Sequence, residues 1–290
     1  MFTADLLLNA VVAGVLLGGF YAAVSIGLTI SFGQLDVVNI AHPAFIVAGS
    51  FFAYVLNERL GLDPILIGLM MTVPFFAVGV AIYRIYYVSF ERHGEESLRG
   101  LAFFFGVMFI VEVALIMAFG VDYRLVDTAY MGKSIKLGFV GLPYRLLVPF
   151  VISALVTVGL YLYLSRTFTG RAILAVSQDR LALRLMGANP VNIKQIAFGL
   201  AVATAAIAGA MLIVIGPVEP SIGRLYIGRV FAIVVLGGMT SIGGTFVAAL
   251  ILGVVESVVG TMFGPSWAPA VSFGFLLVTL AVRPAGLFGR

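Results

Sequence analysis

Long apolar runs alternate with short polar segments along the whole chain. Nine of these runs approach or exceed the about 20 residues that an α-helix needs to cross a bilayer. They cover residues 6–31, 35–56, 64–88, 100–119, 145–164, 195–216, 225–240, 243–263 and 267–283. The pattern predicts an all-α integral membrane protein with about eight to nine transmembrane segments, forming one transmembrane domain over residues 1–290.

Two of the runs are irregular. The run 35–56 opens with polar residues and a proline, and the run 225–240 is short and ends near a pair of glycines. Aligned without a gap, residues 33–49 and 237–253 share one pattern, a polar break followed by an apolar helix with small residues. Such paired interruptions mark the central pathway of many transporters, although a glycine-rich chain also produces them by chance. We therefore expect two broken or short helices in a pseudo-symmetric arrangement.

Composition makes lipid the solvent for most of the chain. Hydrophobic residues make up 62% of it and charged residues only 10%, with a mean hydropathy of +1.15. A water-soluble surface needs more charge than this. The net charge of +4 therefore indicates cytoplasmic loops and anionic lipid headgroups rather than a nucleic-acid partner.

Three polar stretches separate the helices, at residues 89–99, 120–144 and 165–194. The parity of the spans places the first and third on one face, together with the C-terminus if the short run 225–240 crosses. That face carries more lysine and arginine than the other, so the positive-inside rule makes it cytoplasmic. Residues 120–144 are then an external loop.

The stretch 165–194 predicts one short amphipathic helix over residues 171–186, because apolar residues recur in it near helical spacing. Gly187 is placed as its C-terminal cap, and a proline follows at position 190. One interpretation is a coupling helix that docks on a cytoplasmic ATPase, and the other is a helix lying in the lipid headgroups. The candidate coupling residues are Arg171, Gln178, Asp179, Arg180, Arg184 and Gly187.

The two breaks supply candidates for a solute path. Asn39 and His42 are polar groups at the start of an apolar run, where an unsatisfied polar group is costly. Thr240 and Ser241 lie inside a run with four glycines, which suits a broken helix facing the first break or a tight turn between two helices. We favour a structural role for His42 alone and a path-lining role for the first break as a whole.

Two carboxylates fall inside apolar runs, at Glu112 and Glu256. An intramembrane carboxylate is by default a candidate functional group. Proton coupling is one use, and pairing with an arginine to hold the bundle is another. We favour the structural role for Glu256, and both roles stay open for Glu112, which is therefore also a candidate path residue.

Motifs for catalysis, metal binding or nucleotide binding are lacking in the sequence. The two histidines form no zinc motif, and the Gly132-Lys133-Ser134 triplet lacks the first glycine of a phosphate-binding loop, since position 127 is Asp. We expect no catalytic residue, metal or cofactor on this chain, so that any ATP is used by a partner.

Four motifs, in order along the chain, resemble a known family. They are the run 32–43 with Asn39-Ile40-Ala41-His42, the segment with Gly170-Arg171, Gln178-Asp179 and Met186-Gly187, the run 231–256 with its glycine pairs, and the ending 282–289. Together they resemble permeases of branched-chain amino-acid ABC importers, the LivH-type permease more than its paired homologue. Pro43 departs from the pattern, because the family usually has glycine there.

The resemblance implies a heteromeric complex in the bacterial inner membrane. Its other members would be a second, homologous permease, two cytoplasmic ATPases that bind ATP and Mg, and a periplasmic solute-binding protein. The implied solute is a branched-chain amino acid or a related small polar solute such as urea, an amide or an aromatic acid, moved by alternating access. The rival hypotheses are a proton-coupled secondary transporter using Glu112 or Glu256, and a membrane scaffold without a pathway.

Overall fold

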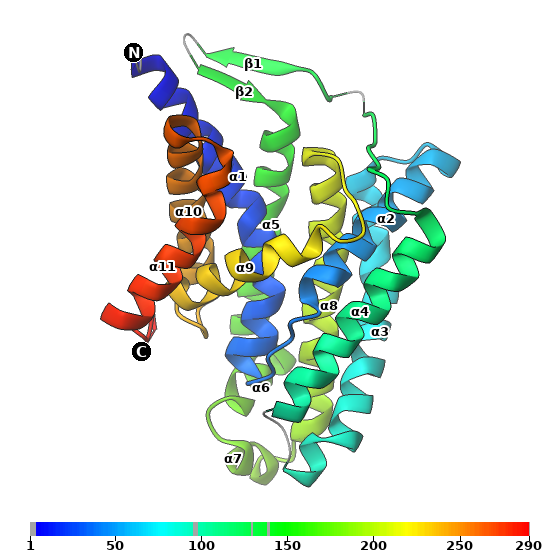
Figure 1. Ribbon diagram of the computed structural model, residues 1–290. Helices are drawn as coiled ribbons and strands as arrows, with labels where there is room; N and C mark the ends of the chain where they lie inside the picture. Colours follow the sequence, from blue (N-terminus) through cyan, green and yellow to red (C-terminus); the bar gives the residue numbers. More distant parts are fainter. Residues whose placement is uncertain (1–3, 95–97, 129, 138–139, 290) are drawn as a thin grey trace.

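The computed structural model describes residues 4–94, 98–128, 130–137 and 140–289, which form a bundle of long helices (Figure 1). The helical elements are α1 (Ala4–Leu28), the π-helix η1 (Thr29–Gln34), α2 (His42–Leu60), α3 (Pro64–Ser89), the 3-10 helix η2 (Glu91–His93), α4 (Leu98–Phe119), α5 (Tyr144–Arg166), α6 (Phe168–Val176), α7 (Arg180–Leu185), α8 (Pro190–Ile215), α9 (Gly223–Gly237), α10 (Ile242–Phe263), the 3-10 helix η3 (Pro265–Trp267) and α11 (Ala268–Val282). The predicted class, an all-α integral membrane protein, is confirmed.

Seven helical segments of the described residues are long and apolar enough to cross a membrane. They are α1 with η1, α3 with η2, α4, α5, α8, α10, and η3 with α11. The two remaining apolar runs form α2, which carries polar residues at both ends, and α9, which has only 15 residues. These are the two runs that the sequence marks as irregular.

Both irregular helices follow a stretch of chain that is not helical. Residues 35–41 precede α2 and residues 216–222 precede α9, and each stretch carries the chain part of the way along the bundle before its helix begins (Figure 1). The first turns sharply at Asp36, whose φ of 57° is left-handed. The irregular helix and the short helix that the sequence predicts are therefore present as α2 and α9.

Helix α8 is the centre of the bundle, with 89% of its most apolar window buried. It packs against α1, α2 and α3. Small residues permit this close approach: a Cβ on Gly209 would lie 2.2 Å from the carbonyl oxygen of Ile46. At the same crossing the Ser50 hydroxyl donates to the Gly209 carbonyl at 2.7 Å. Close backbone packing thus holds α2 on α8.

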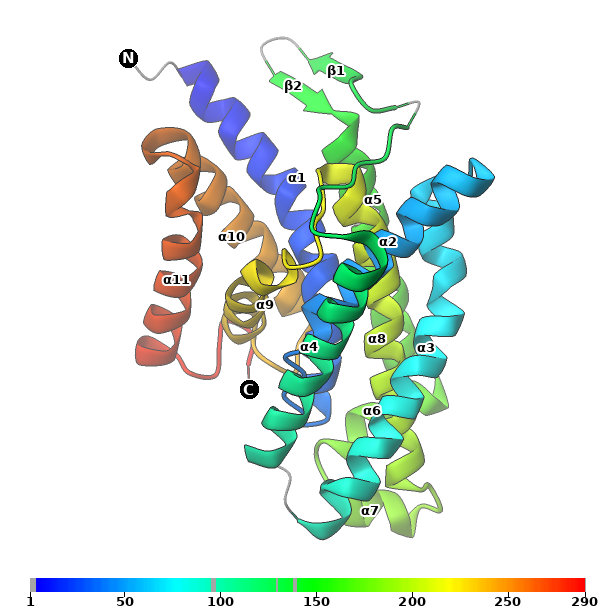
Figure 2. The ribbon, with the colours of Figure 1, turned by 45° about the vertical axis from the view of Figure 1, so that its right-hand side comes forward.

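One end of the molecule carries the β-hairpin of β1 (Ser134–Leu137) and β2 (Val140–Pro143), near the start of α1 (Figures 1 and 2). The predicted loop 120–144 therefore contains a short sheet that the sequence did not reveal. Backbone hydrogen bonds also pair Arg124 with Val218, joining this loop to the stretch before α9.

Burial, with the nearby Asp63 carboxylate, raises the pKa of the Tyr130 hydroxyl in this loop to about 12.

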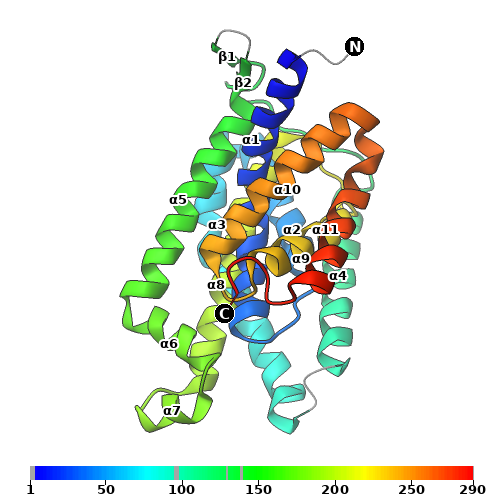
Figure 3. The same cartoon turned by 90° about the vertical axis from the view of Figure 1, so that its left-hand side faces the viewer.

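The opposite end carries α6, α7, the end of α3 and the start of α4, as seen in Figure 3. The polar stretches 89–99 and 165–194 thus lie at one end, as predicted from the parity of the spans. The prediction of one helix over 171–186 was wrong, because residues 177–179 break it into α6 and α7. Asp179 ends the continuity by capping α7, accepting from the backbone N–H groups of Leu181 and Ala182 at 2.8 and 2.9 Å.

Candidate functional site

The two breaks meet in space. A Cβ on Gly33 would lie 1.6 Å from the carbonyl oxygen of Met239, so only glycine fits between them. The Gln34 amide donates to the Thr240 carbonyl at 2.8 Å, and the hydroxyls of Thr29 and Thr245 lie 2.8 Å apart. The glycine-rich run therefore forms the turn between α9 and α10, the second of the two alternatives, and this turn contacts the first break.

The C-terminal segment closes over the second break. The backbone N–H of Leu287 donates to the Leu236 carbonyl at 2.8 Å, and Gly286 and Gly238 both have left-handed φ values, 79° and 88°. A Cβ on Gly286 would lie 2.5 Å from the Gly238 nitrogen. Residues 286 and 287 therefore contact this part of the structure, which was not predicted from the sequence.

A cleft of about 700 Å³ opens beside these contacts. Both breaks and the turn between α6 and α7 contribute polar residues to its lining, namely Gln34, Asp36, Ser177, Gln178, Thr240 and Ser241, and α5 adds Tyr161 and Ser165. Ser241 also caps α10, because its hydroxyl accepts from the Gly244 backbone N–H at 3.0 Å. Of the predicted path residues, Thr240 and Ser241 line this cleft, and the predicted coupling residue Gln178 lines it as well.

Asn39 and His42 are not in the cleft, and both are fully buried. The His42 Nε2 atom lies 3.1 Å from the Val24 carbonyl of α1. Gly27 leaves room for the ring, since a Cβ there would lie 2.2 Å from His42 Cε1. Asn39 accepts from the Ala41 backbone N–H at 3.2 Å. This geometry fits the structural role favoured for His42, a cross-link between α1 and α2.

The two intramembrane glutamates each pair with an arginine of α9. Arg224 donates from Nε and Nη2 to the two oxygens of Glu112, at 2.9 and 2.6 Å. Arg229 reaches Glu256 at 2.8 Å and lies over the rings of Tyr21 and Tyr226. The carboxylates that a proton-coupled transporter would use are thus engaged in ion pairs. Arg229 lies inside the apolar run 225–240 and Arg224 directly before it. This placement of two charged residues was the sequence signal that they have buried partners.

The segment 165–194, which is the predicted coupling segment, has an exposed apolar face. In α7 and its cap, Leu181, Leu185 and Met186 have exposed fractions of 66%, 82% and 79%, while Leu183 is buried. Arg171, Gln178, Asp179 and Arg184 are exposed as well, and the side chain of Arg180 lies outside the described residues. Gly187 ends α7 with a φ of 82°, and the Ala188 N–H bonds to the Leu183 carbonyl at 3.2 Å. The predicted cap at Gly187 is confirmed.

A buried charge network, not anticipated from the sequence, lies just beyond this cap. Lys194 of α8 donates to Glu91 at 2.5 Å, and the Tyr83 hydroxyl of α3 donates to the second oxygen of Glu91. The side chains of Lys194 and Glu91 are only 3% and 7% exposed. The network joins the start of α8 to the end of α3. Elsewhere, no three potential metal ligands come together among the described residues.

The comparisons with known proteins agree with this architecture. The family described as "Branched-chain amino acid transport system / permease component" matches residues 10–280. The chain is 31% identical to the high-affinity branched-chain amino acid transport system permease protein BraD of Pseudomonas aeruginosa, over 98% of this chain and 96% of that protein. It is 26% identical to the corresponding permease protein LivH of Escherichia coli K12, over 96% and 94%.

A more distant relative is the probable branched-chain amino acid transport permease protein LivH of Methanocaldococcus jannaschii, 24% identical over 91% of this chain and 87% of that protein. A chain of PsaBC from Streptococcus pneumoniae in complex with Fab aligns with a TM-score of 0.49 and 13% identity, over 98% of this chain and 94% of that one. That last likeness is too weak to carry an argument.

A multi-pass bundle with two facing breaks and an exposed capped segment is the architecture of a membrane transport subunit. The chain belongs to the family of permease components of branched-chain amino-acid ABC transport systems. It is therefore a transport subunit and not an enzyme, and ATP hydrolysis takes place on partner subunits.

Proposed function

We propose that this chain forms one half of the membrane pathway of an ATP-driven importer for a branched-chain amino acid or a related small polar solute. The other components of the proposed complex are a second, homologous permease, two cytoplasmic ATPases that hold ATP and Mg, and a periplasmic solute-binding protein. The proposed location is the bacterial inner membrane, with α6 and α7 in the cytoplasm. The solute-binding protein docks at the end that carries the hairpin.

The observation that carries this proposal is the apolar face of α7. Leu181, Leu185 and Met186 are exposed at the end of the bundle where α7 stands farthest from the hairpin (Figures 1 and 3). An exposed apolar cluster rimmed by charged residues is typical of a docking surface. Because Ser177 and Leu183 tie this segment to the bundle, a push on α7 is passed to η1 and α8.

The proposed transport cycle is alternating access. Closure of the ATPases moves the segment 165–194, and the two breaks, which touch at Gly33 and Met239, shift against each other. The solute then passes near Thr240 and Ser241. In this scheme Asn39 and His42 do not contact the solute but hold the first break in place. Glu112 contributes to the path indirectly, by orienting Arg224.

The experiment that tests the coupling assignment is co-purification of the ATPases with variants of α7. We expect Leu185→Glu, and separately Arg184→Glu, to reduce the amount of bound ATPase at least about tenfold, because a hot-spot residue at an interface contributes about 2 kcal/mol or more. The matched control is Leu125→Glu, an exposed apolar residue at the opposite end. If the α7 variants retain the ATPases as well as the control does, α7 lies in lipid headgroups and the proposal is wrong.

A further inference from the structure

Arg224 is a charged residue that is half-exposed on the side of a membrane-spanning bundle. Its side chain is 51% exposed, whereas its partner Glu112 is 7% exposed. Helix α4 has 22 residues, a length of about 33 Å. Glu112 lies seven residues before the end of α4, about 10 Å inside that end. The ion pair therefore lies within the apolar part of the bundle.

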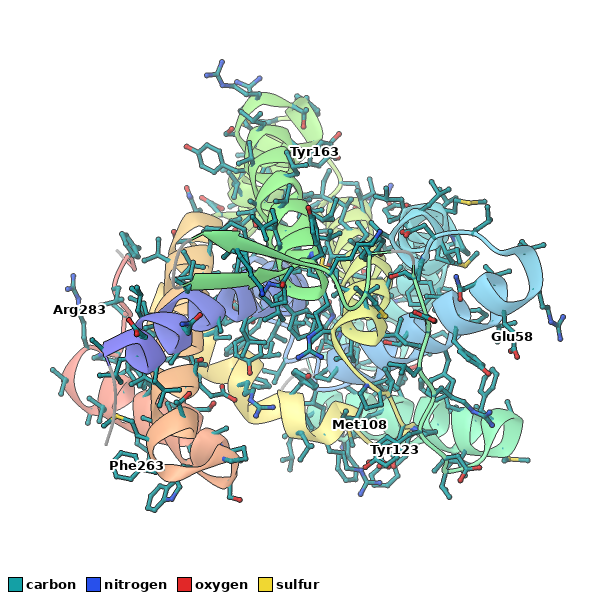
Figure 4. The ribbon with its side chains drawn as sticks, turned by 90° about the horizontal axis from the view of Figure 1, so that it is seen from above. Glu58, Met108, Tyr123, Tyr163, Phe263 and Arg283 are labelled. Carbon is teal, nitrogen blue, oxygen red and sulfur yellow. The ribbon has the colours of Figure 1, made fainter. Side chains whose placement is uncertain are left out.

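The depth of Arg224 and the backbone beside it indicate that its exposed guanidinium does not face lipid chains. A charged group at this depth is rarely exposed to hydrocarbon, and the pair with Glu112 keeps the guanidinium from reaching the headgroups. The stretch 216–222 just before α9 is not helical, and irregular backbone at membrane depth occurs where it is covered by protein or lines a water-filled path. Seen from above, α9 and α4 with Met108 lie along one side of the bundle, away from Tyr163 of α5 (Figure 4).

The guanidinium retains hydrogen-bonding capacity toward the exposed side. Glu112 accepts from Nε and Nη2, and among the described residues Nη1 donates to no protein acceptor. The Phe109 ring lies 5.1 Å from the guanidinium carbon, which fixes the plane of the group. An arginine whose side edge is held by one carboxylate still presents its end, with Nη1 and Nη2, to a second carboxylate.

Arg229, on the same helix, makes the contrast. Its side chain is 16% exposed, and the rings of Tyr21 and Tyr226 lie 5.8 and 5.4 Å away. It is therefore enclosed by its partners, while Arg224 is bound on one side only. Both arginines pair with a glutamate, but only the Arg224 guanidinium stays accessible to a further ligand. This difference assigns separate roles to the two residues.

We propose that Arg224, oriented by Glu112, binds the carboxylate of the solute on the path between this chain and the partner permease. The assignment rests on the proposed importer function, and it narrows the solute to one that carries a carboxylate, which excludes urea and simple amides. Because Glu112 already neutralises the arginine, binding comes from directed hydrogen bonds rather than net charge. Weak binding of this kind suits a path, where a solute must also leave.

The test uses the complete importer complex in proteoliposomes with L-leucine as the probe. The variants are Glu112→Gln/Arg224→Gln, which removes both charges, and Glu112→Arg/Arg224→Glu, which restores an ion pair in the reverse order. The control is Arg59→Gln at the exposed end of α2. The readouts are L-leucine uptake, ATP hydrolysis stimulated by the binding protein, and the size of the complex.

We expect both double variants to keep the complex and the stimulated hydrolysis while uptake falls about tenfold to a hundredfold, the loss for a charge-assisted hydrogen bond. Uptake within about twofold of wild type in the reversed pair would overturn the proposal, because Arg224 would then only tie α9 to α4. A complex that loses the second permease, or a parallel loss of stimulated hydrolysis, would overturn it too. Failure of the importer assignment would appear separately, as wild-type uptake that needs no ATP.

Discussion

Replacing Gly33 by alanine is expected to prevent the two breaks from meeting and to destabilise the protein severely. A Cβ at this position would lie 1.6 Å from the Met239 carbonyl oxygen and 2.5 Å from its carbon. The obstructing atoms belong to the backbone and cannot rotate away. Relief requires separating η1 from the turn between α9 and α10, which also removes the hydrogen bond from Gln34 to the Thr240 carbonyl. We expect a cost above about 3 kcal/mol, beyond ordinary overpacking.

The measurement is the thermal midpoint and the yield of monodisperse protein in detergent. Gly106→Ala is the matched control, because a Cβ on Gly106 of α4 would meet no atom within 4 Å. The control should match the wild type or exceed it slightly, since alanine favours a helix over glycine by about 1 kcal/mol. Equal stability of Gly33→Ala and Gly106→Ala would show that the breaks do not touch in the protein.

The nine apolar runs of the sequence correspond to the helices of the structure because membrane length and hydrophobicity are local properties. The run 64–88, for example, becomes α3 (Pro64–Ser89). The breaks were also predictable, since polar residues and glycines interrupt the chain at fixed places. The sequence could not establish that Gly33 and Met239, far apart along the chain, lie in contact, because that depends on how α1 packs on α10.

The single helix predicted over 171–186 failed for an identifiable reason. The break at residues 177–179 is close in length to one helical turn of about 3.6 residues. The apolar spacing before and after it therefore continues as if the helix were unbroken. Asp179, a favourable N-cap residue, was the signal for a new helix start.

The arginine partners of Glu112 and Glu256 could not be predicted from the sequence either. Their carboxylates are visible as polar residues in apolar runs, and so are the arginines of α9. The assignment of Arg224 to Glu112 and of Arg229 to Glu256 follows only from the way α9 lies between α4 and α10. The geometry gives Glu112 a partner that the sequence could not name, because Arg224 contacts both of its carboxylate oxygens.

The second large effect is expected for Lys194→Met, which should destabilise the packing of the start of α8 against the end of α3. Lys194 and Glu91 are almost completely buried, and Tyr83 completes the network. Removing the lysine takes away the ammonium group that contacts the buried Glu91 carboxylate, and breaking a buried ion pair from one side costs about 3–5 kcal/mol. We expect a large fall in the thermal midpoint, whereas Lys136→Met, at an exposed lysine of the hairpin, should have little effect.

The double variant Glu91→Gln/Lys194→Met separates stability from coupling. It removes both charges and keeps an acceptor for the Tyr83 hydroxyl, so most of the lost stability should return. Because the network lies between the cap at Gly187 and the body of α8, we expect this variant to bind the ATPases and hydrolyse ATP while L-leucine uptake falls severalfold. Full uptake in the double variant would mean that the pair serves folding alone, and that movement of α7 reaches the breaks through Ser177 and Gln34 instead.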